Sequence, residues 1–290
     1  MSTYVVAGVS GRVGSVVAAE LLARGQRVRG LTRVATRGAA WAAGGGEAAV
    51  GSLDDREFLT RALEGAAGSF VLLPEDPFAA DFHGGRRAMA DAIVSAVRER
   101  EVPHVVVLSA VAASLADGNG PAKDLHYLER AVRKTAARVT VVRASWFQEN
   151  VGAVVAAARA AGIYPNLMGS ADVTFPTIAT RDVGRIVAAL LLAPPPTSEV
   201  IDLVGPSYSA RDLATALGAA LGRPLQVVDV PPPARVGALV EAGLPQSFAQ
   251  EVAELYACVE SGRVRPEGDR LISASTGIEQ VLPGLIGMTR

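Results

Sequence analysis

Three glycines spaced three residues apart lie near the start of the chain, in the segment YVVAGVSGRVG (residues 4–14). They follow a short apolar run and precede a helical pattern. In that setting Gly8 allows a tight turn, Gly11 lets the backbone approach a pyrophosphate, and Gly14 lets helix and strand pack closely. The helix N-terminus then supplies unpaired N–H donors and a partial positive charge. The segment predicts a dinucleotide site, whose expected contacts are Gly8, Ser10, Gly11, Arg12, Val13 and Gly14.

The end of the second predicted strand indicates which dinucleotide binds. A site that prefers NAD places Asp or Glu there, about 20 residues beyond the loop. Here the segment is GLTRVATR (residues 30–37), with Thr32 and Arg33 and no acidic residue nearby. Arg33 and Arg12 would flank the 2′-phosphate of NADP. A charge-assisted hydrogen bond is worth about 1.5–3 kcal/mol, which is roughly tenfold to a hundredfold in affinity. We therefore expect NADP(H) in preference to NAD(H).

A proton donor is harder to assign. One known proton-donor pattern is Tyr-x-x-x-Lys, because that spacing puts both groups on one face of a helix, where the ammonium eases proton transfer by the phenol. Here Tyr127 is followed four residues later by Ala131, and Lys123 precedes Tyr127 in the reversed order. His126, in the same helical segment, is the candidate catalytic residue, with a purely structural histidine as the alternative.

Other reactive groups are sparse. His83, in DFHGG, follows the fourth predicted strand, where it would line a substrate pocket, whereas His104 comes before a strand. The sequence has no Gly-x-Ser-x-Gly elbow. Cys258 is the single cysteine, so no intramolecular disulfide is possible and a zinc cluster is not expected. We expect no bound metal.

Alternating strands and helices must position these groups. Strand patterns at 4–8, 27–33, 69–74, 104–111 and 138–144 alternate with helical patterns at 14–25, 54–65, 86–100 and 124–135. This alternation indicates βαβ units and a parallel sheet. The expected fold is α/β, a Rossmann-type doubly wound parallel sheet with a smaller C-terminal α/β cap.

The pattern loosens after residue 149, where glycine and proline become frequent. We expect an NAD(P)-binding Rossmann domain at 1–149 and a mainly substrate-binding cap at 150–290, with the segment around 178–193 packing back on the Rossmann domain. A strand at 199–206 and a helix at 209–222 are expected in the C-terminal part. The cap would close over the carboxyl ends of the strands, where ligands bind in such sheets.

Bulk properties exclude several classes of function. The chain has 290 residues, half of them apolar, and a formal net charge of -1. It can bury a large core, and it lacks the basic footprint of a nucleic-acid binder. The N-terminal segment lacks the features of a signal peptide. The longest strongly apolar stretch, 186–193, is too short to span a membrane. A cytoplasmic protein with no nucleic-acid or membrane partner is expected.

Several segments, in order, resemble the NmrA-like family of atypical short-chain dehydrogenases/reductases. They are GVSGRVG, LTR, GSLDDREFLTRALEGAAGSFVLLP, VPHVVVLSAV, TVVRASWFQENV, TIATRDVGRIVAALL and IDLVGPSYSARDLATALGAALGRPL. The resemblance covers nearly the whole chain. The family includes NADPH-dependent quinone reductases, azoreductase-like proteins, isoflavone-type reductases and catalytically silent NADP-sensing regulators.

The resemblance implies roles for further residues. Those it places against the cofactor are Ser52, Leu53, Leu73, Pro74 and Ser109, the last near the nicotinamide and a second catalytic candidate. Those it places in the substrate pocket are Trp146, Phe147 and Asn150. Many members also carry Lys or His four residues before a helix glutamate. Four residues before Glu129 this chain has Leu125, which cannot transfer protons.

The resulting expectation is an NADPH-dependent oxidoreductase that reduces a quinone or a related aromatic or carbonyl compound by hydride transfer. A hydride acceptor of this kind needs orientation and a shielded pocket above all, because the cofactor carries the difficult chemistry. One alternative is a non-catalytic NADP(H)-binding regulator with a protein partner. A further alternative is a biosynthetic ketoreductase or epimerase. The expected partner is a small-molecule substrate, and the expected state is a monomer or homodimer.

Overall fold

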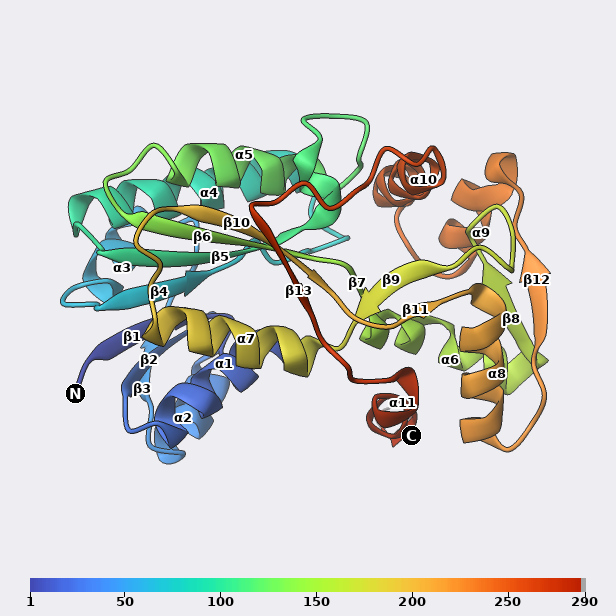
Figure 1. Cartoon of the computed structure of the whole chain (residues 1–290), viewed down its shortest axis with the longest axis horizontal. Helices are drawn as coiled ribbons and strands as arrows, with labels where there is room; N and C mark the ends of the chain where they lie inside the picture. Colours follow the sequence, from blue (N-terminus) through green and yellow to red (C-terminus); the bar gives the residue numbers. More distant parts are fainter. Residues whose placement is uncertain (288–290) are drawn as a thin grey trace.

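The structure, a computed structural model, describes residues 1–287. Its main body is an eight-stranded sheet in the order β13-β10-β6-β5-β4-β1-β2-β3 (Figure 1). Every strand pair within this sheet is parallel. The strands are β1 (Thr3–Ala7), β2 (Arg27–Thr32), β3 (Glu47–Val50), β4 (Gly68–Val71), β5 (His104–Ala110), β6 (Arg138–Ala144), β10 (Glu199–Val204) and β13 (Arg270–Ser273).

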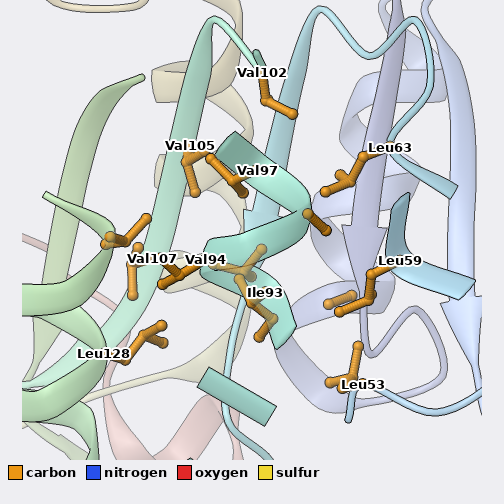
Figure 2. Close-up of a cluster of buried hydrophobic side chains, with 14 of the residues drawn as sticks. Leu53, Leu59, Leu63, Ile93, Val94, Val97, Val102, Val105, Val107 and Leu128 are labelled. Atoms are coloured by element: carbon orange, nitrogen blue, oxygen red, sulfur yellow. The ribbon is translucent and has the colours of Figure 1, made fainter. Parts of the chain in front are cut away.

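Helices cover both faces of this sheet. The first five helices and α7 are α1 (Arg12–Ala23), α2 (Ala35–Ala43), α3 (Arg56–Ala62), α4 (Phe82–Glu99), α5 (Ala122–Val132) and α7 (Thr180–Leu192). In Figure 1, α1 and α7 lie on one face, and α3, α4 and α5 lie on the other. Strand β5 shows why the sheet needs both layers. Val105 and Val107 pack in the cluster beneath α3, α4 and α5 (Figure 2), whereas Val106 packs in the cluster beneath α1 and α7. All three are fully buried, as expected for a two-sided parallel strand.

The C-terminal part has two small sheets of its own, β11-β9-β7 and β12-β8. Its strands are β7 (Trp146–Phe147), β8 (Ile163–Asn166), β9 (Phe175–Ile178), β11 (Ser207–Tyr208) and β12 (Gln226–Asp229). Its α-helices are α6 (Val155–Ala161), α8 (Ala210–Leu221), α9 (Arg235–Glu241), α10 (Gln246–Glu260) and α11 (Leu282–Gly287). Short 3-10 helices are η1 (Val111–Ser114), η2 (Gln148–Val154), η3 (Pro232–Ala234) and η4 (Ile278–Gln280). A separate apolar cluster fills this part, so it has a core distinct from that of the main sheet.

The predicted fold class is confirmed, with one difference in how the C-terminal half contributes. As expected, α7 packs back on α1. The strand expected at 199–206, however, does not belong to the cap. It is β10, which pairs with β6, and β13 follows it at the edge of the main sheet. The run VIDLV is apolar enough to be buried on both sides, and β6 leaves an edge for it to cover. The domain boundary at 149 stays a prediction.

The chain reverses direction in the sheet between β1 and β4. It runs outward from β1 to β2 and β3, and then returns to place β4 on the other side of β1. In open α/β sheets, ligands bind in the crevice outside the carboxyl ends of the strands at such a switch point. The glycine loop follows β1 directly. Among the helices described, none is both long and apolar enough to cross a membrane.

Candidate functional site

The glycine loop between β1 and α1 is closed by backbone contacts. Gly8 has φ +64°, a conformation that favours glycine, and the Gly11 N–H donates to the Gly8 carbonyl at 2.8 Å. A Cβ on Gly14 would lie 2.2 Å from the Gly8 carbonyl oxygen and 2.8 Å from that of Ala7. No side chain fits there without movement of the backbone. The tight turn and the close approach of helix and strand therefore depend on glycine at both positions.

The N-terminus of α1 is open to an anion. Its N-cap, Gly11, has no side chain to bond the first N–H groups, and the first turn contains no acidic residue. Ser10 and Arg12 are exposed beside it. Val13 is buried in the core beneath α1 and α7, so it can offer a ligand only its backbone. Free N–H donors and the helix dipole together make a fitting cradle for a pyrophosphate.

Beyond the loop, the carboxyl ends of β2 and β3 carry the residues expected near the adenosine. Arg33 is exposed after β2, and the first turn of the following helix, α2, contains no acidic residue. Ser52 is half-buried after β3. The Leu53 side chain belongs to the buried cluster beneath α3 and α4 (Figure 2), so it supports the site from below. The exposed guanidinium of Arg33 at the end of β2 would suit a 2′-phosphate.

The loop after β4 is held by a buried arginine that sequence reasoning missed. Arg86, 2% exposed, donates to the carbonyl oxygens of Leu73 at 3.2 Å and Pro74 at 3.4 Å. It also reaches the Pro121 carbonyl at the start of α5. Burial lowers the pKa of Arg86, and this effect outweighs the opposing influence of Glu75 and Asp124. The backbone expected beside the ribose is thus tied to α4 and α5.

At the end of β5, the Ser109 hydroxyl donates to Glu129 Oε1 of α5 at 2.5 Å. Glu129 is in turn held by Arg143 of β6, whose Nε lies 3.0 Å from Oε1 and whose Nη2 lies 2.7 Å from Oε2. We call Ser109, Glu129 and Arg143 the Glu129 cluster. Both Ser109 and Glu129 are buried. Sequence reasoning used Glu129 only to count along the helix and did not identify Arg143, although an arginine inside the apolar strand RVTVVRA was a usable signal.

His126 is half-buried and is oriented by η1. Its Nδ1 lies 2.8 Å from the Ala113 carbonyl oxygen. A carbonyl only accepts hydrogen bonds, so Nδ1 carries the proton and Nε2 is left as the nitrogen for exchange with a further group. Its neighbour Leu125 is partly buried against the cores beside α5. A catalytic role for His126 stays a prediction.

His83 lies in a group of charged side chains that we call the Asp124 cluster: His83, Arg86, Arg87, Lys123, Asp124 and Glu251. His83 Nδ1 is 2.6 Å from Asp124, and its Nε2 is 3.1 Å from Glu251 of α10. The contact at Nδ1 is a hydrogen bond, whereas Nε2 meets Glu251 as a close ion-pair contact without a hydrogen bond. Both nitrogens of His83 therefore face protein groups, and its expected substrate contact stays a prediction that would need the ring edge or a movement of α10.

The rest of the Asp124 cluster balances buried charge. Asp124 is fully buried and faces Arg86 Nε at 3.3 Å and Arg87 Nε at 3.5 Å. Burial raises the pKa of Glu251, but the charged groups of Lys123 and His83 beside it outweigh that effect, so its pKa lies below the usual value. Nearby, the ring centroids of Phe82 and Phe248 are 5.0 Å apart.

The cluster therefore ties α10 to the first turns of α4 and α5, and a close backbone contact strengthens that junction. Gly120, with φ +57°, precedes α5, and a Cβ on it would lie 2.1 Å from the Glu251 carbonyl oxygen.

The residues expected to line a substrate pocket do not all pack on the same side of β7. Trp146 packs with the core of the C-terminal part, with its ring centroid 5.5 Å from that of Phe175. Phe147 packs against the core of the main sheet instead. Asn150 is exposed on η2. Trp146 and Phe147 are only partly buried, so each keeps some surface for a ligand, but the structure does not bring Trp146, Phe147 and Asn150 together on one face.

No group of three or more His, Cys, Asp or Glu side chains within residues 1–287 is arranged to hold a metal ion. At the carboxyl ends of the strands, the glycine loop follows β1 and the Glu129 cluster lies at the end of β5.

Comparisons with known proteins agree with this arrangement. The model of the NmrA-like family matches residues 1–281, and the chain belongs to that family. It is 26% identical to an NAD(P)H azoreductase of Xenophilus azovorans over 253 residues, which is 87% of this chain and 85% of that protein. It is 31% identical to a (4-alkanoyl-5-oxo-2,5-dihydrofuran-3-yl)methyl phosphate reductase of Streptomyces griseus over 226 residues, which is 76% of this chain and 74% of that protein.

Solved structures show the same fold. The triphenylmethane reductase of Citrobacter sp. superimposes with a TM-score of 0.82 at 20% identity, over 99% of this chain and 100% of that one. The NADPH-dependent quinone oxidoreductase of Escherichia coli, complexed with NADPH, superimposes with a TM-score of 0.80 at 18% identity, over 98% and 99%.

Proposed function

We propose that this NmrA-like protein is an NAD(P)H-dependent oxidoreductase that reduces a quinone or a related aromatic or carbonyl compound. The observation that carries the proposal is the uncapped α1 N-terminus behind a loop that favours glycine at Gly8 for its positive φ and requires it at Gly14 for lack of space. Such a cradle fits a dinucleotide pyrophosphate. The two curated relatives are named as reductases, one of them for NAD(P)H, which supports the same reaction class here.

The proposed cofactor is NADP(H) in preference to NAD(H). Arg12 and Arg33 are both exposed at the adenosine end, and neither α1 nor α2 has an acidic residue in its first turn. A carboxylate at that place would accept a ribose hydroxyl and repel a 2′-phosphate. An arginine there would instead attract a 2′-phosphate and donate hydrogen bonds to it.

The bound nicotinamide supplies the hydride, and the protein supplies binding, orientation and a shielded surface. The α1 N-terminus holds the pyrophosphate, and Arg86 fixes the loop after β4. Trp146 and Phe147 pack against different cores, and either one would offer partly buried aromatic surface to a flat acceptor. His126, oriented by the Ala113 carbonyl, would deliver a proton from Nε2. A weakly basic product such as a reduced quinone also takes its proton from water.

A second candidate function is a non-catalytic NADP(H)-binding regulator. The observation that favours it is the absence of a Tyr-x-x-x-Lys pair, with apolar Leu125 where a proton donor would stand four residues before Glu129. A biosynthetic ketoreductase or epimerase on the same cofactor is a further alternative.

The test is NADPH oxidation against a panel of quinones, azo dyes and ketones, together with NADPH binding by fluorescence. A reductase turns over at least one aromatic acceptor, and His126→Ala lowers kcat. Binding without turnover on the whole panel would instead favour the regulator, and turnover restricted to ketones would favour the ketoreductase. If the protein bound neither NADP nor NADPH, all of these functions would be wrong together.

A further inference from the structure

Ser109 lies near the carboxyl end of β5, and its hydroxyl already makes a hydrogen bond. It is the next-to-last residue of β5, a central strand of the main sheet, and it is 4% exposed. Its Oγ lies 2.5 Å from Glu129 Oε1. The family resemblance places this serine beside the nicotinamide. The question is what its hydroxyl can offer to a group bound there.

Arg143 of β6 is the charged partner of Glu129. Its guanidinium meets both carboxylate oxygens, at 3.0 and 2.7 Å, in the two-pronged geometry that suits a carboxylate. Burial lowers the pKa of Arg143, but the hydrogen bonds and charge of Glu129 outweigh it, so its pKa lies above the usual value. Arg143 is also the register partner of Ser109 in the neighbouring strand, so both side chains leave the sheet on the same face.

The ion pair sets the direction of the hydrogen bond between Ser109 and Glu129. A carboxylate held on both oxygens by an arginine accepts hydrogen bonds, so the Ser109 hydroxyl donates its single proton to Glu129. The lone pairs of Oγ remain available to accept a hydrogen bond. Toward any third group Ser109 is therefore an acceptor, and it cannot give a proton to a substrate while Glu129 is charged.

We propose that Glu129 and Arg143 are positioning residues that fix the Ser109 hydroxyl as a hydrogen-bond acceptor for an N–H or O–H group at the nicotinamide end of bound NADP(H). The inference rests on the proposed function only as far as cofactor binding, and it holds whether or not the protein turns over a substrate. It removes Ser109 from the candidate proton donors and leaves His126 or water in that role.

The competing explanation is that the Glu129 cluster only holds α5 against the sheet. Two ligands separate the explanations. NADPH contains the nicotinamide half, whereas adenosine 2′,5′-bisphosphate contains the adenosine and 2′-phosphate but no nicotinamide. A residue that acts at the nicotinamide end changes the affinity for the first ligand alone, whereas a general disturbance of the fold changes both.

The experiment measures dissociation constants of both ligands by calorimetry for the wild type, Ser109→Ala, Glu129→Gln and the double variant. Loss of one neutral hydrogen bond should weaken NADPH binding about threefold to tenfold in each single variant. The double variant should be no weaker than the more affected single one, because Glu129 acts through Ser109. Affinity for adenosine 2′,5′-bisphosphate should be unchanged throughout.

Glu199→Gln is the matched control. Glu199 also pairs with an arginine through both oxygens, with Arg270 at 2.8 and 2.9 Å. It is the first residue of β10, however, so it lies at the amino ends of the strands, away from the predicted site. It should leave both affinities unchanged. If Glu129→Gln does not fold, Arg143→Lys replaces it, since lysine keeps the charge but cannot make the two-pronged contact.

Unchanged NADPH affinity in the variants, equal weakening of both ligands, or additive effects in the double variant would each overturn the inference. Selective weakening in a protein that oxidises no NADPH would uphold it while the reductase proposal fell. A wild type that bound adenosine 2′,5′-bisphosphate but not NADPH would overturn both.

Discussion

The glycine loop and the Glu129 cluster both lie at the carboxyl ends of the strands, but they are built in different ways. The loop uses one continuous segment and works through backbone groups and the absence of side chains. The Glu129 cluster takes one side chain each from β5, α5 and β6, and works through the hydrogen bonds and the ion pair of those side chains. The loop therefore needs positions without side chains, and the cluster needs oppositely charged side chains in contact.

The Asp124 cluster extends this comparison along α5. Asp124 and Glu129 are both buried carboxylates of the same helix, each paired with arginine. Glu129 has its partners on strands of one sheet, whereas Asp124 and Glu251 join the first turns of α4 and α5 to α10. We infer that the first is the more rigid of the two and that the second contributes chiefly to stability, which variants can test.

The largest effect is expected for Asp124→Asn. The change leaves the buried Arg86 guanidinium without its nearest carboxylate and removes the charge that faces His83. Removing one partner of a buried ion pair typically costs about 3–5 kcal/mol of the free energy of unfolding. Urea unfolding measures it. Asp172→Asn is the control, because Asp172 also pairs with an arginine, Arg211, but at the surface. Equal, small losses in both variants would show that the Asp124 cluster does not stabilise the α10 junction.

Gly14→Ala breaks the glycine loop itself. A Cβ 2.2 Å from the Gly8 carbonyl oxygen must push α1 away from β1, which removes the N–H groups from the pyrophosphate. Loss of two charge-assisted hydrogen bonds predicts NADPH binding weakened by more than about a hundredfold. Gly237→Ala, on α9 with open space around it, should bind NADPH like the wild type. Tight NADPH binding by Gly14→Ala would refute the role of the loop.

His104 tests the opposite end of β5, where a buried polar group has no ligand role in our proposal. Burial, assisted by the charge of Arg138, lowers its pKa from 6.5 to about 4. Between those values the unfolded chain binds more protons than the folded one, so stability falls as the pH falls from 6.5 to 4. The shift corresponds to about 3 kcal/mol of the free energy of unfolding at the acid limit.

The variant His104→Gln keeps a polar group near Thr140, the partner of His104 Nε2 at 3.0 Å, and removes the titration. Its unfolding free energy, measured by urea between pH 7 and pH 4, should decline less than that of the wild type. Parallel curves for the two proteins would show that His104 does not contribute to the acid sensitivity.

The smallest effect is expected for Arg33→Ala. Arg33 is exposed, so solvent screens its charge, and the NADP/NAD affinity ratio should fall about tenfold. Titration of both cofactors measures the ratio. Arg130→Ala, a change on the exposed face of α5, is the control and should leave the ratio as it is. An unaltered ratio in Arg33→Ala would remove Arg33 from cofactor selection.

Patterns of local spacing predicted the parallel sheet and its flanking helices correctly. They placed β10 in the wrong part of the molecule, because a strand's sequence does not say which edge it will cover. They also could not anticipate that His83 would lie between Asp124 and Glu251, since these residues come from three helices far apart in the sequence. Leu53 and Val13 were expected to contact the cofactor, and the structure shows that their side chains belong to the core.

The sequence by itself determined the fold class and the loop, because both follow from short-range requirements: strand and helix periodicity, and glycine where a side chain would collide. Tertiary structure alone decided the state of the polar groups. The Ser109 hydroxyl donates to Glu129 because α5 brings Glu129 to it and β6 brings Arg143 to Glu129, and toward any third group it is therefore left as an acceptor. Protonation depends on which charges meet in a buried place, and that meeting is set by packing rather than by spacing along the chain.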